Sequence, residues 1–175
     1  MPVPLRVLIL EDSPTEAELM VRHLREAGYE PVWRRVETES DYLSHLDPSL
    51  DVVLLDYTLP DTSGPRALER LRDGGWDVPA IVVTGTVSEE AALDCLRLGA
   101  NDYILKDRLA RLGSAVRSAL EQRELRRERD AVATDLALRS RQLEAVRAIT
   151  LEIARETDLA PLLALALRSA AELVG

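Results

Sequence analysis

The residues best suited to chemistry in this sequence are acids that follow mainly apolar runs. The apolar residues 52–55 lead directly into Asp56, and the run 5–10 leads into Glu11 and Asp12. Clustered carboxylates repel one another and raise one another's pKa unless a cation joins them. Because an all-oxygen, partly hydrated site suits Mg²⁺, these acids predict a magnesium centre wherever the fold brings them together.

A hydroxyl and an amine end two further runs of the same kind. Thr84 ends the run 80–84, and Lys106 ends the run 102–106. Lys106 is the one lysine among 22 basic residues, all the others being arginine. A carboxylate can be the nucleophile toward a phosphoryl group, and Mg²⁺ and an ammonium can stabilise charge on that group as it moves. The residue types are therefore those of phosphoryl transfer to a carboxylate.

The elements that must position these residues alternate between strand and helix. The patterns predict strands at 5–10, 31–36, 52–56, 80–84 and 102–106. Helices are expected between them, with Ser13 and Thr38 as capping residues, and a further helix from about Leu109, which Gly113 makes irregular. Five strands alternating with helices predict an α/β fold with a parallel sheet covered on both faces, in the flavodoxin-like order 2-1-3-4-5. That order brings the acids, Thr84 and Lys106 to one crevice at the carboxyl edge.

Composition narrows the class of protein. The chain has 175 residues, of which 46% are hydrophobic, so we expect a folded domain of ordinary size with an appendage. No apolar run reaches the roughly 18 residues of a membrane span, and the net charge of −9 argues against nucleic-acid binding. A single cysteine, Cys95, fits a reducing compartment, so a cytoplasmic location without membrane attachment is expected. We interpret His23, His45 and Cys95 as ordinary structural residues.

Taken together, the motifs at the strand ends form one recognisable set. In chain order they are Glu11-Asp12, Asp56-x-x-Leu59-Pro60-x-x-x-Gly64, Thr84-Gly85 and Tyr103-x-x-Lys106. This set resembles the receiver domain of two-component response regulators, the CheY-like fold. The resemblance covers about residues 4–122, within a domain predicted at 1–122. Other doubly wound proteins fit less well. A flavodoxin needs a phosphate-binding loop where Glu11-Asp12 stands, and a haloacid-dehalogenase-type phosphatase needs Asp-x-Asp there.

The resemblance implies roles for the site residues. Asp56 is then the phosphoacceptor, Thr84 and Lys106 contact the phosphoryl group, and Tyr103 is the aromatic switch. The expected Mg²⁺ ligands are Glu11, Asp12, Asp56 and the backbone carbonyl of Thr58. One position departs from the family, because Asp107 stands where a proline with a cis peptide bond is usual. Either that bond is trans and the loop differs, or the loop stores strain.

The region after the receiver-like part has a different character. Between 123 and 156 nine positions follow strict 4,3 spacing, which indicates a coiled-coil seam. They are Leu125, Arg129, Val132, Leu136, Arg139, Leu143, Val146, Thr150 and Ile153. Residues 157–175 have the pattern of a further helix and resemble the opening helix of a GAF domain, in which case the chain is a fragment of a longer sensor or kinase protein. The alternative is a lone amphipathic helix that folds back on the receiver.

The combined expectation is a signalling protein rather than an enzyme with an external substrate. Its partner would be a histidine kinase or a phosphotransfer protein, and its only catalysis self-phosphorylation and autodephosphorylation. Residues 114–156 would join two copies as a parallel homodimer. The alternatives left open are a dimeric receiver-like scaffold that only binds, and the N-terminal fragment of a hybrid sensor histidine kinase.

Overall fold

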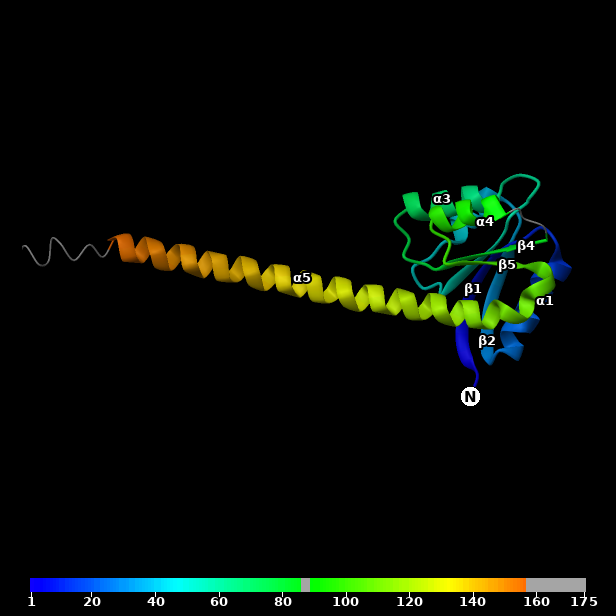
Figure 1. The fold of residues 1–175 in the computed structure, drawn as a ribbon, viewed down its shortest axis with the longest axis horizontal. Helices are drawn as coiled ribbons and strands as arrows, with labels where there is room; N and C mark the ends of the chain where they lie inside the picture. Colours follow the sequence, from blue (N-terminus) through cyan, green and yellow to red (C-terminus); the bar gives the residue numbers. More distant parts are fainter. Residues whose placement is uncertain (86–88, 157–175) are drawn as a thin grey trace, which may run out of the picture. The chain divides into compact units, whose positions relative to one another are not determined.

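Five parallel strands form one sheet in the order β2-β1-β3-β4-β5 within the described residues, as the sequence predicted. The computed structural model describes residues 1–85 and 89–156 (Figure 1). The strands are β1 (Val3–Leu10), β2 (Tyr29–Val36), β3 (Val52–Asp56), β4 (Ala80–Thr84) and β5 (Asp102–Leu105). Residues of β3 and β4 are buried throughout, because helices cover both sheet faces.

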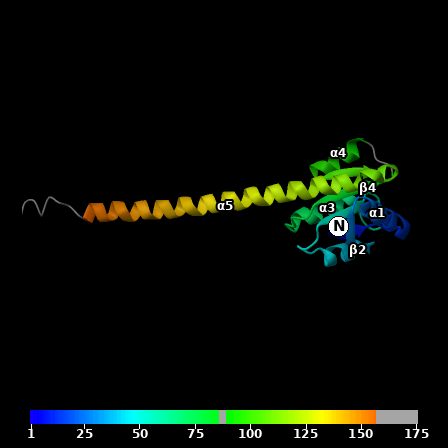
Figure 2. The same cartoon turned by 90° about the horizontal axis from the view of Figure 1, so that it is seen from below.

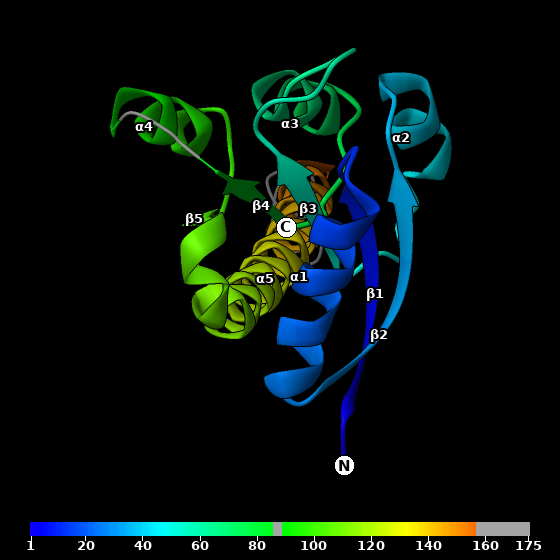
Figure 3. The ribbon, with the colours of Figure 1, turned by 90° about the vertical axis from the view of Figure 1, so that its right-hand side faces the viewer.

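Helices on opposite faces of the sheet produce two apolar clusters (Figure 3). They are α1 (Pro14–Glu26), α2 (Glu39–His45), α3 (Gly64–Asp73), α4 (Glu89–Arg97), the 3₁₀ helix η1 (Lys106–Arg111) and α5 (Leu112–Glu156). On one face, Met20 of α1 and Val116 of α5 pack with Ile9. On the other, Tyr42 of α2 and Leu68 of α3 belong to the second cluster, which also contains Cys95, in line with its interpretation as a structural residue.

Local caps fix where the helices next to the acids begin. The Ser13 hydroxyl accepts a hydrogen bond of 3.4 Å from the backbone N–H of Glu16, and Pro14 occupies the first turn. Gly28 follows α1 with a φ of 91°, a left-handed conformation that glycine adopts without strain. Helix α1 therefore starts directly after the Glu11-Asp12 turn, at the carboxyl edge of the sheet.

The entry into α5 differs from the expected helix start near Leu109. Lys106 leaves the strand and opens η1, where Arg108 has non-helical angles (φ −121°, ψ 28°), and the α-helix begins at Leu112. The described residues contain no cis peptide bond, so the bond between Lys106 and Asp107 is trans. Gly113 lies so close to α1 that an added Cβ would overlap the Cβ of Ala27. This close helix contact is the reason for the glycine.

The two outer strands of the sheet differ in length. β2 forms one edge with eight residues, and both β1 and β2 begin two residues earlier than predicted because Val3 pairs with Tyr29. Pro31 lies inside β2, at a position where an edge strand tolerates the missing N–H. The N-terminus lies at the start of β1, beside β2 (Figures 1 and 2). The expected edge position of β2 is confirmed.

The chain divides into two compact units, residues 1–126 and 127–175. In the second unit, the side chains of α5 that the structure describes, up to residue 152, are exposed. Exposed apolar ones include Val132, Leu136, Leu138, Leu143 and Val146. The expected GAF-like helix at 157–175 lies outside the described residues. Among the described helices, none has the length and apolarity needed to cross a membrane.

Candidate functional site

Polar side chains that are buried in the described residues concentrate at the carboxyl edge of the sheet. Four such residues are buried, namely Glu11, Asp56, Thr84 and Arg123, and the first three belong to the predicted site. Burying a polar group costs free energy unless it is hydrogen-bonded or paired. Their burial therefore requires specific partners, which the geometry supplies for the two acids.

The predicted acids come together. Carboxylate oxygens of Glu11, Asp12 and Asp56 all lie within 4.8 Å of one another. Glu11 and Asp12 follow β1, and Asp56 is the last residue of β3, which lies next to β1 in the sheet. Glu11 and Asp56 are buried and Asp12 is exposed, so water can reach one side of the cluster. Such a donor set suits a hard cation that keeps some of its water ligands.

Lys106 pairs with this acidic cluster from the end of β5. Its ammonium Nζ lies 3.0 Å from Glu11 Oε2 and 3.2 Å from Asp56 Oδ2. A third contact, which the sequence patterns did not identify, joins the same ammonium to the carboxylate of Glu16 in α1. Glu16 stands in the first turn of α1, and its only sequence signal was its position in the capping pattern.

The electrostatics of the site follow from burial and from these contacts. Burial raises the pKa of Glu11 to about 7, against the opposing hydrogen bonds from the Ser13 N–H and Lys106. Burial also raises the pKa of Asp56, and the charge of Lys106 offsets part of that rise. For Lys106, burial lowers the pKa, but hydrogen bonds to Glu16 and Glu11 outweigh it, so the pKa is raised and the ammonium stays charged.

Arg35, near the end of β2, is a second site residue that the sequence analysis missed. Its guanidinium donates hydrogen bonds to the backbone carbonyls of Glu11, at 3.0 Å, and Asp12, at 3.2 Å. Glu37 holds the same guanidinium in an ion pair of 2.6 Å. Arg35 thus fixes the backbone of the turn that carries two of the acids.

The loop after Asp56 turns sharply back toward α3. Thr58 forms an antiparallel bridge with Ser63, and the Gly64 N–H donates to the Tyr57 carbonyl at 3.1 Å. A Cβ on Gly64 would lie 2.9 Å from the backbone oxygen of Asp56, closer than real Cβ contacts. Glycine at this position therefore lets α3 begin directly against the strand that ends in Asp56.

Thr84 and Tyr103 belong to β4 and β5, the two strands that follow β3 in the sheet. Asp56 pairs with Val83, so Thr84 stands one residue further along β4. Tyr103 of β5 pairs with Val82, two residues before Thr84, which places Tyr103 and Thr84 on the same sheet face. Tyr103 is partly buried against the cluster that contains Cys95. Residues 86–88, which follow Thr84 and Gly85, are outside the described part of the chain.

Known proteins are similar to the part of the chain that forms the sheet. The family model described as "Response regulator receiver domain" matches residues 7–117. The transcriptional regulatory protein BaeR of Escherichia coli is 33% identical over 129 residues, which are 70% of this chain and 52% of that protein. A protein-glutamate methylesterase/protein-glutamine glutaminase of Caulobacter vibrioides is 35% identical over 114 residues, 63% of this chain and 33% of that protein. The chain thus spans about half or less of these relatives.

A solved structure shows the same fold. The crystal structure of a CheY-like response regulator receiver domain protein from Methanospirillum hungatei has a TM-score of 0.59 at 26% identity, covering 70% of this chain and 98% of that chain. The likeness thus covers nearly all of that solved chain. The part of this chain that the structure covers is similar in length to residues 7–117, which the family model matches.

Proposed function

Because the chain belongs to the response regulator receiver domain family, we propose that it accepts a phosphoryl group on Asp56 from a histidine kinase or phosphotransfer protein, with Mg²⁺ as cofactor. The observation that carries this proposal is the contact of Lys106 with both Asp56 and Glu11. The three side chains come from the ends of three strands, and the charged lysine stands beside the carboxylate that would become phosphorylated.

The chemistry assigned to Asp56 is nucleophilic attack on phosphorus. One carboxylate oxygen forms the new O–P bond while the P–N bond of a phosphohistidine breaks, and the leaving imidazole keeps the electron pair and takes a proton from water. Lys106 offsets negative charge on the phosphoryl oxygens. Its compact ammonium has room to move from Asp56 to a phosphoryl oxygen, which a planar guanidinium would do less easily.

The cation would be held by Glu11, Asp12, Asp56 and the backbone carbonyl of Thr58. The fit rests on the three clustered carboxylates, which repel one another more than the single charge of Lys106 can offset. When bound, Mg²⁺ neutralises charge on the phosphoryl group and on the acids. Arg35 supports this role, because it holds the backbone of the Glu11-Asp12 turn.

We assign the response to phosphorylation to Thr84 and Tyr103. Thr84 would contact the phosphoryl group, and Tyr103, on the same sheet face, would turn inward when Thr84 moves. Support comes from the strand register, in which both residues are on one sheet face of neighbouring strands, two positions apart, and from the partial exposure of Tyr103. A partly exposed aromatic ring packed against a core has an alternative position available to it.

We further propose that the receiver, at about 1–122, signals through a parallel dimer formed by the helix at 123–156. The seam residues Val132, Leu136 and Leu143 are 68%, 67% and 70% exposed in the single chain, and pairing would bury them. Arg139 occupies a seam position but forms an ion pair of 2.9 Å with Asp135 of its own helix. A charged residue at such a position adds no apolar contact between the two helices, so it weakens the seam. A marginal seam suits a signal, because a small shift can change its register.

The direct test is transfer of phosphate from acetyl phosphate to the purified protein, with and without Mg²⁺. The wild type should gain one acid-stable, base-labile phosphoryl group, and Asp56→Asn should gain none while it unfolds at a similar denaturant concentration. Asp61→Asn is the matched control, because Asp61 is exposed in the loop that follows Asp56. Labelling of Asp56→Asn equal to that of the wild type would refute the assignment. An unlabelled wild type would favour the binding scaffold.

A further inference from the structure

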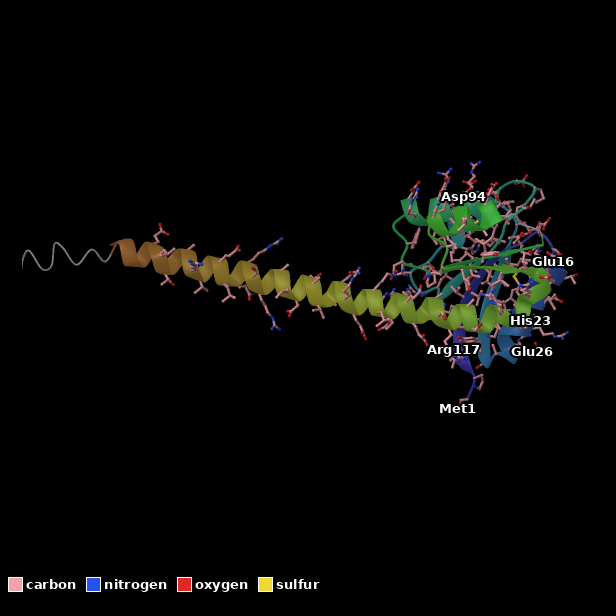
Figure 4. All side chains as sticks on the ribbon, in the orientation of Figure 1. Met1, Glu16, His23, Glu26, Asp94 and Arg117 are labelled. Carbon is pink, nitrogen blue, oxygen red and sulfur yellow. The ribbon has the colours of Figure 1, made fainter. Side chains whose placement is uncertain are left out.

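Glu16 makes a contact to the active-site lysine that phosphoryl transfer to Asp56 does not use. Its carboxylate binds the Lys106 ammonium from the first turn of α1, while Glu11 and Asp56 bind it from the sheet. Figure 4 shows Glu16 and Glu26 at opposite ends of α1. Glu16 belongs to the end that follows the acidic turn, which is why a helix residue reaches the same ammonium as two strand-end acids.

The number of hydrogen-bond donors makes this third contact important. A lysine ammonium has three N–H donors, and three carboxylates surround this one. A phosphoryl oxygen can gain a hydrogen bond from Lys106 only if one of the three carboxylates releases it. The resting protein thus has all the donors of its active-site cation engaged.

Exposure indicates which carboxylate is released. The side chains of Glu11 and Asp56 are 0% and 8% exposed, whereas that of Glu16 is 42% exposed. A buried carboxylate that loses its cation has no water to replace it, but a half-exposed one can be hydrated at once. Glu16 is therefore the partner that Lys106 can leave at the lowest cost.

We propose that Glu16 occupies the lysine donor that the phosphoryl group requires, and so restrains phosphorylation of Asp56. The inference rests on the proposed phosphoryl transfer to Asp56 and names a residue that regulates it. Glu16 competes with the phosphoryl group for Lys106, and its charge also repels an incoming phosphate anion. Release of Lys106 from Glu16 accompanies phosphorylation and frees the first turn of α1 from its link to η1, which follows β5.

The kinetic test compares Glu16→Gln and Glu16→Ala with Glu18→Gln. Glu18 is an exposed acid on the same helix, so its replacement removes the same charge without touching Lys106. With acetyl phosphate and Mg²⁺ at low ionic strength, both Glu16 variants should be phosphorylated roughly three to ten times faster than the wild type. Glu18→Gln should change the rate by less than about twofold, because solvent and salt screen the charge of an exposed residue. The gain should shrink at high salt, which a purely structural effect would not do.

A second measurement reports on the contact itself, whether or not Asp56 is phosphorylated. Lys106 is the only lysine in the sequence, so ¹⁵N-lysine labelling gives a single side-chain ammonium signal in an NMR spectrum. Glu16→Gln should shift this signal and Glu18→Gln should leave it in place. Beryllofluoride with Mg²⁺, a phosphoryl analogue, should move the wild-type signal and make it insensitive to Glu16→Gln.

The outcomes separate this inference from the proposed function. A wild type that acetyl phosphate labels, together with Glu16 variants that are slower or unchanged, overturns the restraining role alone. An equal gain in Glu18→Gln also overturns it, because the effect would then be general. A wild type that is never labelled overturns the role of Asp56 and that of Glu16 with it, and the ammonium signal then shows whether the contact exists.

Discussion

The guanidinium of Arg123 donates a hydrogen bond of 2.9 Å to the backbone carbonyl of Leu50, in the loop that leads into β3. Arg123 is buried and also contacts Asp77, in the loop before β4, at 3.4 Å. The strand that begins after Leu50 ends at Asp56. The part of α5 that belongs to the first compact unit is therefore bound to the loops at the amino ends of β3 and β4. The acids lie at the opposite, carboxyl ends of the strands.

Removal of this contact should destabilise the protein. Arg123→Ala leaves the Leu50 carbonyl without its donor, in a buried position, and we expect the free energy of unfolding to fall by about 1–3 kcal/mol. Arg141→Ala is the control, since Arg141 is an exposed arginine of the same helix that lies off the 4,3 seam. That variant should remain within about 0.5 kcal/mol of the wild type. Urea denaturation measures both, and equal losses would contradict the anchoring role.

Gly64→Ala should disturb the site through the backbone. The new methyl group would lie 2.9 Å from the Asp56 carbonyl oxygen and 3.2 Å from the Cα of Tyr57, so strand or helix must shift. We expect a loss of about 1–3 kcal/mol in unfolding free energy, as for other overpacked sites. Phosphorylation by acetyl phosphate should also slow, because the shift displaces Asp56. A variant with wild-type stability and rate would show that the loop absorbs the methyl group without cost.

Asp12→Ala tests whether Mg²⁺ binds at the acidic cluster. Asp12 is the exposed member of the acidic cluster, so its loss should spare the fold and weaken Mg²⁺ binding at least roughly tenfold. In chelator the variant should be as stable as the wild type or slightly more so, because one of three repelling charges is gone. Titration calorimetry with Mg²⁺ gives the affinity, and Asp61→Ala serves as the control. Unchanged Mg²⁺ affinity in Asp12→Ala would place the cation elsewhere.

The proposed dimer can be tested with two leucines of the same helix. Leu136 lies on the 4,3 seam and is 67% exposed, while Leu138 is 55% exposed and off the seam. Leu136→Glu places like charges opposite each other in a parallel pair and should give monomers, whereas Leu138→Glu should assemble like the wild type. Sedimentation velocity distinguishes monomer, dimer and trimer. A monomeric wild type, or equal effects of both substitutions, would exclude the seam as the interface.

The sequence sufficed for the sheet and for the residues at its strand ends, for a physical reason. A strand buried on both faces must be apolar along its length, so a polar residue at its end stands out, as Asp56 and Thr84 do. Strand order then followed from the connection rules, and order alone brings the strand ends together. The start of α5 was less predictable, because the close approach to the Cβ of Ala27, not a local pattern, explains Gly113.

Residues that act through long side chains escaped the sequence analysis. Glu16 looked like an ordinary capping acid, Arg35 like one residue of the strand predicted at 31–36, and Arg123 like one charge among many on a helix. Each role depends on where a flexible side chain ends in three dimensions, and spacing along the chain carries no information about that. Arg123 illustrates the limit, since its partner Leu50 is 73 residues away in the sequence.

The eight-residue edge strand β2 has a consequence for how the protein behaves at high concentration. An open edge of this length is a template on which another chain can add a strand and start an aggregate. Pro31, the third of these eight residues, removes one backbone donor from that template, and the charged side chains of Arg34 and Arg35 follow it along the strand. These features discourage another chain from pairing with β2 and so lower the risk of aggregation at this edge. Arg35 has a second role there, because it also holds the acidic turn.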